Sequence, residues 1–346
     1  MVSPEQSKGG YVKNLTPRSF SGKNVAVIGG TGMIGSPLVE FLIKEGAKVT
    51  SVSLDDPSRV HPRSAFLRLD LREPENCLRA CHGMDYVFNL FGVKGSPVMN
   101  KKYPATFFET TILITLNLLI AARKAGVKGY LYTSSVGTYP PAEIFYEDDM
   151  WKGFPSENDW FPGWAKRMGE VQVDANKREY GWEDITIIRP PNVYGPRDNF
   201  DSENAMVVPS LIKRAIHASE TGQPLVVWGD GSAERDFIHA RDVAQGMIVG
   251  AKYGAGGIYN VGNGTAYTIH QLVKTVVKHM PNKVEIVWDT SKPSGDRKRL
   301  MDISRIRAIG FCPEVSLDEG IKETIKWYLE NRTTAKDRYD VFDEKK

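Results

Sequence analysis

The chain has 346 residues, which is enough for one large domain or for two unequal ones. Hydrophobic residues make up 41% and charged residues 25%, the balance of an ordinary globular protein. The net charge is +3, and the lysines and arginines are spread along the chain. Because there is no basic block and no alternation of basic and aromatic residues, we expect no nucleic-acid partner.

Cysteine usage argues against a metal-binding protein, and hydropathy argues against a membrane protein. Cys77, Cys81 and Cys312 are an odd number, and no second cysteine pair accompanies the first two, so we expect reduced cysteines and no metal site. The longest apolar stretch, residues 112–122, is interrupted by polar side chains and is too short to span a bilayer. We therefore expect a soluble, cytoplasmic protein that does not enter a membrane.

From Asn24 onward the chain alternates between short β-branched runs and helical periods. We expect strands at residues 24–28, 48–54, 65–69, 86–90, 129–133 and 185–189, and helices that include 33–45, 106–125 and 163–180. Strands that alternate with helices predict an α/β fold with a doubly wound parallel sheet.

Composition divides the chain into four parts. Residues 1–23 are polar and predict a flexible N-terminal arm, and residues 24–189 form the sheet domain. After Arg189, glycine and proline pairs separate short segments, which predicts a smaller α/β lobe over residues 190–331, at the carboxyl edge of the sheet. A strand around Tyr259 is expected to return to the first domain. Residues 332–346 are charged, and we expect a frayed tail.

The segment GGTGMIG (residues 29–35) follows the first expected strand and opens the first expected helix. Its glycines allow a tight turn and let backbone amides approach a pyrophosphate, while the helix N-terminus adds favourable partial charge. In this strand–turn–helix context the pattern predicts a dinucleotide-binding Rossmann domain.

The choice between NAD and NADP stays open. Domains of this kind often end their second strand with an acidic residue that binds the adenine ribose. That position falls on Ser53, with Asp55 and Asp56 just beyond it. Ser53 and Arg59 favour a 2′-phosphate, whereas the two aspartates oppose one. Asp70-Leu71, after the third strand, is expected to meet the adenine.

Several segments together resemble the extended short-chain dehydrogenase/reductases that modify nucleotide sugars, the NAD-dependent epimerase/dehydratase family. They are GGTGMIG, Asp70-Leu71, Thr133-Ser134-Ser135, RPPNVYGP (189–196) and RDFIHARDV (235–243). The resemblance covers residues 24–330 and is strongest to GDP-L-fucose synthase and GDP-mannose 3,5-epimerase. It implies a nucleotide-sugar substrate, with a GDP-sugar favoured, NAD or NADP as the cofactor, and a homodimer built from helices 106–125 and 163–180.

The resemblance also implies catalytic residues. Family members use a Ser or Thr, a Tyr, and a Lys four positions after the Tyr, which lowers the Tyr pKa so that the phenol exchanges a proton with the sugar. Ser134, Ser135 and Lys166 match, but the tyrosine position holds Pro162. Tyr139 is the nearest candidate to replace it.

At two places this sequence lacks the catalytic residues that particular members of the family use. The epimerising Cys and His of GDP-L-fucose synthase correspond here to Val136 and Met206, which argues against a 3,5-epimerase. Ser135 is followed by Val136-Gly137 instead of the Asp-Glu pair of the 4,6-dehydratases, which argues against that mechanism too.

The resemblance assigns ligand-binding positions to both halves of the chain. Cofactor-binding residues are Gly29, Thr31, Gly32, Met33, Ile34, Ser53, Arg59, Asp70, Leu71, Leu90, Lys166, Pro190 and Asn192. Substrate-binding residues are Lys94, Ser135, Asn192, Val208, Lys213, Trp228, Arg235 and Arg297. Arg235 is expected to pair with the nucleotide diphosphate, for which its forked guanidinium is suited.

Three functions fit these residues. The first is NAD(P)-dependent oxidation, reduction or epimerisation of a nucleotide sugar. The second is a non-catalytic relative that binds a dinucleotide or nucleotide sugar as a regulatory subunit, an alternative that Pro162 raises. The third is a reductase of a small carbonyl compound without a nucleotide, against which the Arg235 and Trp228 segments argue.

Overall fold

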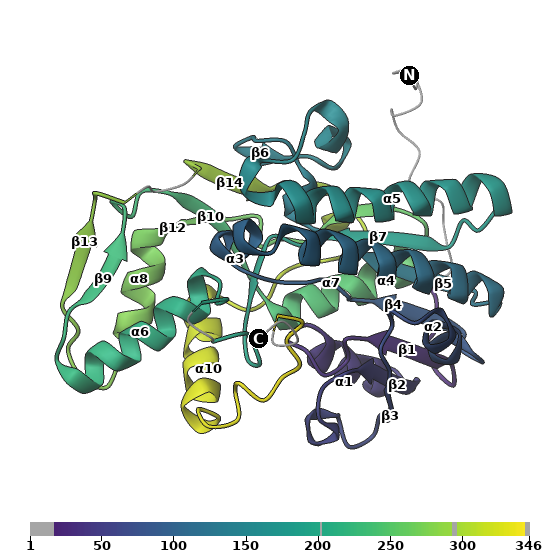
Figure 1. Ribbon diagram of the computed structural model, residues 1–346, viewed down its shortest axis with the longest axis horizontal. Coiled ribbons are helices and arrows are strands. Elements are labelled where there is room, and N and C mark those ends of the chain that lie inside the picture. The colour runs from purple at the N-terminus through teal and green to yellow at the C-terminus, as the bar shows by residue number, and fades with distance from the viewer. Residues whose placement is uncertain (1–16, 201–202, 293–295, 343–346) are drawn as a thin grey trace.

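The computed structural model describes residues 17–200, 203–292 and 296–342. The expected arm and tail therefore fall partly outside the described residues, at 1–16 and 343–346. Figure 1 shows a large sheet covered by helices and a smaller lobe beside it that carries the β9–β13 pair at its far end.

The large sheet has seven strands in the order β3-β2-β1-β4-β5-β7-β11, and every neighbouring pair is parallel. Its strands are β1 (Asn24–Ile28), β2 (Lys48–Ser53), β3 (Ala65–Arg68), β4 (Tyr86–Asn89), β5 (Gly129–Thr133), β7 (Ile185–Arg189) and β11 (Ile258–Asn260). The central strands β4, β5 and β7 are buried along their whole length, as expected for a sheet covered on both faces. The predicted doubly wound parallel sheet is confirmed.

Helices cover both faces of the sheet. On one face α2 and α5 both contact α4, and on the other α1 contacts α7. The helices of this domain are α1 (Gly35–Lys44), α2 (Pro74–Cys81), α3 (Pro97–Lys102), α4 (Pro104–Lys124), α5 (Trp160–Tyr180) and α7 (Ala240–Tyr253). Short 3-10 helices are η2 (Pro57–Arg59), η3 (Val136–Thr138), η4 (Glu147–Lys152) and η5 (Glu157–Asp159).

The lobe is built from short strands and three longer helices. One sheet has the order β12-β10-β14-β6, with β8 paired to β10, and β9 pairs with β13. Its elements are β6 (Ile144–Phe145), β8 (Asn192–Tyr194), α6 (Val207–Thr221), β9 (Leu225–Trp228), β10 (Glu234–His239), β12 (Ala266–Thr268), α8 (Ile269–Lys278), β13 (Ile286–Asp289), β14 (Lys298–Met301), α9 (Ser304–Arg307) and α10 (Leu317–Glu330). Capping boxes stabilise the N-termini of α8 and α10. Strand β11 returns to the large sheet beside β7, as expected for a strand around Tyr259.

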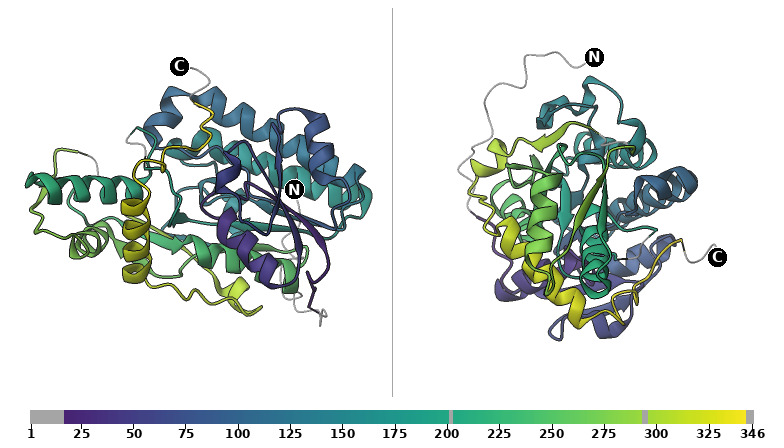
Figure 2. Two further views of the ribbon diagram at one scale, coloured as in Figure 1. Left: turned by 90° about the horizontal axis from the view of Figure 1, so that it is seen from below. Right: turned by 90° about the vertical axis from the view of Figure 1, so that its left-hand side faces the viewer.

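Both chain ends pack more firmly than their polar composition suggested. Within the expected arm, Phe20 is 2% exposed and packs edge-on against Tyr86, and Arg18 forms an ion pair with Asp184. The C-terminal residues up to 342 are not frayed: they leave α10 and run back to the first domain (Figure 2). In each case a few buried aromatic side chains hold a segment whose average composition is polar.

Helix α4 is long and apolar enough to cross a membrane by length and composition alone. Half of its apolar window is buried inside the fold, and the helix packs between α2 and α5. Burial against a sheet explains the apolar composition, so α4 is a core helix.

Candidate active site

The glycine loop between β1 and α1 has the shape that the sequence predicted. Gly29 adopts a φ of +79°, which a residue with a Cβ rarely takes, and it turns the chain at the end of β1. An added Cβ at Gly35 would collide with the carbonyl oxygen of Gly29, so only glycine lets the helix start so close to the turn. The loop amides and the start of α1 thus face the carboxyl edge of the sheet.

Beside this loop lies a cavity of about 270 Å³. Eleven of the predicted ligand-binding residues line it: Gly29, Thr31, Gly32, Met33, Ile34, Ser53, Arg59, Asp70, Leu71, Leu90 and Lys94. The cavity is mostly apolar with a few polar and charged groups, the usual character of a small-molecule site. Lys166, Pro190 and Asn192 do not line it. The glycine loop, the helix start and the cavity together fit a dinucleotide.

Sequence reasoning missed several residues of this cavity. Arg197, Asp198, Arg72 and the C-terminal residues 338–342 also line it. Arg197 has a φ of +67°, and its Nη1 donates to the carbonyl oxygens of Thr31 (3.2 Å) and Arg59 (2.7 Å). The signal for Arg197 was its place directly after the YGP turn, whereas nothing local in the sequence points to the C-terminal residues.

The acidic residue at the end of β2 is Asp55, two positions after the Ser53 that the spacing selected. The Asp55 carboxylate accepts from Thr31 Oγ1 at 2.6 Å and lies 3.8 Å from Arg59 Nε. The Ser53 hydroxyl accepts the Asp55 amide at 3.0 Å and so holds the turn that carries this carboxylate. Ser53 positions the acidic group at this end of the cavity.

Lys166 lies at the carboxyl ends of β4 and β5, as expected of the family lysine. Its Nζ donates to the carbonyl oxygens of Phe91 (2.6 Å) and Thr133 (2.7 Å). Burial lowers the pKa of Lys166 to about 7, although the nearby Glu170 opposes the shift. A Cβ on Gly92 would approach this ammonium to 3.2 Å, so a glycine keeps the space beside Lys166 open.

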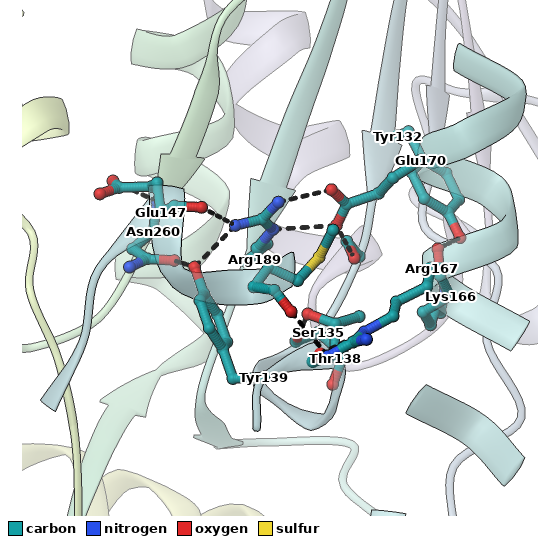
Figure 3. A network of polar contacts seen from close by, with 12 residues as sticks. Tyr132, Ser135, Thr138, Tyr139, Glu147, Lys166, Arg167, Glu170, Arg189 and Asn260 are labelled. Carbon is teal, nitrogen blue, oxygen red and sulfur yellow. Dashed lines mark hydrogen bonds and ion pairs between the residues drawn. The ribbon is translucent and has the colours of Figure 1, made fainter. Parts of the chain in front are cut away.

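A buried polar network lies behind Lys166 (Figure 3). Arg189 binds both carboxylate oxygens of Glu170, with Nε–Oε1 2.9 Å and Nη2–Oε2 2.5 Å. Ser134 donates to the same Glu170 at 2.5 Å, so its hydroxyl is held inside the protein. Ser135 is only partly buried, and its Oγ accepts the Gly137 amide at 3.1 Å. Ser135 is therefore the serine that faces outward at the strand end.

Tyr139 is not placed as a substitute for the family tyrosine. It is 1% exposed, its hydroxyl donates to Asn260 Oδ1 at 2.7 Å, and it accepts from Arg189 Nη1 at 2.7 Å. Burial raises the pKa of Tyr139, which makes its proton harder to remove. Our expectation for Tyr139 is thus corrected: the hydroxyl belongs to the interior network.

Pro162 lies in the first turn of α5, which begins at Trp160, three residues before the expected start. A proline is compatible with this turn, because its missing N–H would have no partner inside the helix. The turn is packed so tightly that a Cβ on Gly163 would collide with the carbonyl oxygen of Gly137. The position of the family tyrosine therefore holds a pyrrolidine ring without an ionisable group.

The predicted substrate residues do not gather at one place. Trp228 is 61% exposed on β9, at the far end of the lobe, and the side chain of Arg297 is 91% exposed near Glu143. Val208 is 2% exposed in the lobe core, so its side chain cannot touch a ligand. Lys213 is partly buried on α6. These positions were implied by the resemblance to a known family, and such a match in sequence does not fix the direction of a side chain.

Other predicted substrate residues are held by polar contacts. Arg235 Nη1 donates to the carbonyl oxygens of Glu234 and Asp296, both at 2.7 Å, and burial together with Arg299 lowers its pKa. The Asn192 amide donates to the carbonyl oxygen of Asp236 at 3.0 Å. Lys94 forms a 2.8 Å ion pair with Asp198 at the edge of the cavity.

Comparisons with known proteins agree with this geometry. A probable GDP-L-fucose synthase 1 of Oryza sativa subsp. japonica is 34% identical over 322 residues, which cover 91% of this chain and 94% of that protein. The GDP-L-fucose synthase of Escherichia coli (strain K12) is 30% identical over 327 residues, 90% of this chain and 98% of that protein. The structure of UDP-glucose 4-epimerase from Thermotoga maritima with UDP-glucose superposes with a TM-score of 0.78 and 29% identity, covering 89% of this chain and 99% of that one.

The model of a protein family described as the NAD dependent epimerase/dehydratase family matches residues 25–262. This span contains the glycine loop, both serines, Lys166 and β11. The ligand that fits the glycine loop is accordingly a nicotinamide dinucleotide. The chain belongs to the NAD dependent epimerase/dehydratase family.

Proposed function

We propose that this chain transforms a nucleotide sugar by NAD(P)-dependent hydride transfer and that the sugar is carried by GDP. The observation that carries the proposal is Lys166, whose amine lies between the ends of β4 and β5. A buried lysine held by two carbonyl oxygens is costly for a protein that needs only a scaffold. The GDP preference rests on the similarity to GDP-L-fucose synthases of rice and E. coli.

Each group of the site has a role in this proposal. When bound, the nicotinamide dinucleotide supplies a hydride acceptor or donor. In its protonated form, Lys166 would hold the nicotinamide ribose with the third N–H, which its two carbonyl partners leave free. The Ser135 Oγ accepts the Gly137 amide, which leaves its own proton free to bind the reacting sugar oxygen. Because Pro162 offers no phenol, we propose that water carries the proton to or from that oxygen.

A panel of GDP-, UDP- and dTDP-sugars tests the proposal. Each sugar is incubated in heavy water with the protein and the oxidised or reduced form of NAD or NADP, and the products are separated by chromatography and measured by mass spectrometry. We expect a new product from a GDP-sugar, recognised by its retention time, its mass or its deuterium content, and we expect this product to be lost in Lys166→Ala. Arg178→Ala, in an exposed ion pair at the far end of the same helix, is the matched control and should stay active. An unchanged panel, or full activity of Lys166→Ala, would contradict the proposal.

A second function is favoured by Pro162 together with the buried Tyr139. With no proton-transfer phenol at the site, the chain would bind a dinucleotide and a nucleotide sugar as a regulatory subunit without turning either over. The same panel separates the two functions, because the regulatory function predicts binding of NAD or NADP by calorimetry and no change in any sugar.

We also propose a cytoplasmic homodimer. On α4 and α5 the apolar side chains of Leu113, Leu116, Met168 and Val171 are all at least 36% exposed. An exposed apolar surface of this kind on two neighbouring helices fits burial against the same helices of a second copy. Sedimentation equilibrium should give twice the chain mass, and Val171→Glu should give a monomer.

A further inference from the structure

The C-terminal residues cross the end of the cavity where β2 and η2 lie. Residues 338–342 line the same cavity as the glycine loop. Phe342 is 3% exposed and packs against the rings of Tyr103 and Phe107, with centroid distances of 5.3 and 5.1 Å. Asn204 donates to Asp340 at 3.3 Å. Figure 2 shows this yellow segment running from α10 toward the blue helices α3 and α4. The segment is thus anchored on both sides of the cavity.

The C-terminal segment also binds the carboxylate of Asp55, the acidic group at this end of the cavity. The backbone amide of Tyr339 donates to Asp55 Oδ1 at 2.7 Å, while Thr31 donates to Oδ2 at 2.6 Å. Both carboxylate oxygens therefore already accept a hydrogen bond, and Arg59 lies 3.8 Å away. A carboxylate in this position selects NAD by accepting the ribose hydroxyls. Here each oxygen of the carboxylate already accepts one hydrogen bond from the protein, and the Arg59 guanidinium lies close to its charge.

Three guanidinium groups line this end of the cavity: those of Arg59, Arg197 and Arg338. Arg59 Nη1 donates to the carbonyl oxygen of Asp337 at 3.2 Å, which places the Arg59 side chain against the C-terminal segment next to Arg338. Burial and the neighbouring Arg338 both lower the pKa of Arg59. Burial and Arg59 likewise lower the pKa of Arg197. Three partly buried guanidinium groups at one end of a cavity favour the binding of an anion.

Two of these groups have free donors. The Arg59 Nε is buried and has no hydrogen-bond partner, its nearest acceptor being Asp55 at 3.8 Å. The Arg338 side chain makes no hydrogen bond or ion pair with the described part of the chain. Arg197, by contrast, is bound to the glycine loop through the Thr31 carbonyl oxygen, where the pyrophosphate is expected. Arg59 and Arg338 are therefore available to donate hydrogen bonds to a second anion in the cavity.

We propose that the C-terminal segment is part of the cofactor site, and that Arg338 together with Arg59 binds the 2′-phosphate of NADP. A planar guanidinium forms two parallel hydrogen bonds to a phosphate, and two guanidiniums neutralise its double charge. The inference rests on the proposed use of a nicotinamide dinucleotide and selects NADP over NAD. Arg338 is then a specificity-determining residue that the chain supplies from its C-terminal segment.

Binding measurements test this without any sugar turnover. Dissociation constants are measured by calorimetry for NADPH, NADH, adenosine 2′,5′-bisphosphate and 5′-AMP with the full chain. Because a hydrogen bond to a charged group contributes tenfold or more in affinity, the protein should bind NADPH at least about tenfold more tightly than NADH. Arg338→Ala should weaken NADPH and the bisphosphate about tenfold and change NADH and 5′-AMP by no more than about twofold.

Arg332→Ala is the matched control, because Arg332 lies on the same segment but pairs with Glu220 outside the cavity. It should bind all four compounds as the unaltered protein does. Equal losses of affinity for NADPH and NADH in Arg338→Ala would overturn the proposal, because the segment would then line the cavity without recognising the 2′-phosphate. A preference for NADH, or no effect of Arg338→Ala, would also overturn it. Failure of the proposed function would look different: selective NADPH binding with no product from any sugar.

Discussion

Glu170 and Arg189 form a two-point ion pair in the interior of the protein, with side chains only 4% and 2% exposed. The pair joins α5, which carries Lys166, to β7, and it receives the Ser134 hydroxyl as a third partner. The positions of Lys166 and of Ser134 at the end of β5 therefore depend on a buried contact between α5 and β7.

Removing one partner of this pair should be strongly destabilising. Glu170→Ala leaves the Arg189 guanidinium buried without its counter-charge, so we expect the free energy of unfolding to fall by about 3–5 kcal/mol. Urea denaturation followed by circular dichroism measures this change. Glu40→Ala removes an exposed helical ion pair with Lys44 and should cost no more than about 1 kcal/mol. Equal effects of the two substitutions would contradict the role of the buried pair.

Lys166 should make stability depend on pH. Burial lowers its pKa to about 7, whereas the unfolded chain keeps this lysine protonated up to about pH 10. Between these values the unfolded state binds more protons than the native state, so this group makes stability rise with pH. Lys166→Met removes the titration.

We therefore expect the stability of Lys166→Met relative to the unaltered protein to decline as the pH is raised from about 7 to about 10. Denaturation curves at several pH values measure the difference. If the difference in stability stays constant over this range, Lys166 keeps its proton in the native protein. Burial then does not lower the pKa of Lys166, and the prediction is wrong.

Tyr139→Phe distinguishes a structural tyrosine from a catalytic one. The substitution removes the hydrogen bonds to Asn260 and Arg189, so the free energy of unfolding should fall by about 1–2 kcal/mol. Turnover of the substrate found in the sugar panel should persist within about threefold, because general acid–base groups contribute about a hundredfold or more. A loss of kcat of about a hundredfold, with little change in stability, would show that Tyr139 takes part in the reaction.

Gly35→Ala should disrupt the glycine loop. The new methyl group would collide with the Gly29 carbonyl oxygen, and the turn and the start of α1 cannot both keep their places. We expect NADPH and NADH to bind about tenfold more weakly or not at all. Gly126→Ala is the control: its φ of +72° makes alanine strained, but the site is open and far from the loop in sequence. It should lose about 1 kcal/mol of stability and keep both affinities.

The sequence by itself determined the parallel sheet and the glycine loop, whereas the resemblance to a known family implied Ser135 and Lys166. The sheet and the loop rest on local patterns: buried β-branched runs such as Asn24–Ile28, and glycines at a turn. Parallel strands meet at a common edge, so residues at their ends are brought together whatever the details of packing. The α/β fold and the dinucleotide loop could thus be predicted without coordinates.

Only the tertiary structure decided which side chains reach the site. Tyr139 was the nearest candidate in sequence, yet the packing of η3 turned its hydroxyl to Asn260 and Arg189. The amide of Tyr339 reaches Asp55 across 284 residues of chain, a contact that no local pattern encodes. Composition predicted a frayed tail, because average polarity does not register the single Phe342 that anchors it. Such contacts depend on the shape and burial of the folded surfaces, which exist only once the sheet and the lobe have packed together.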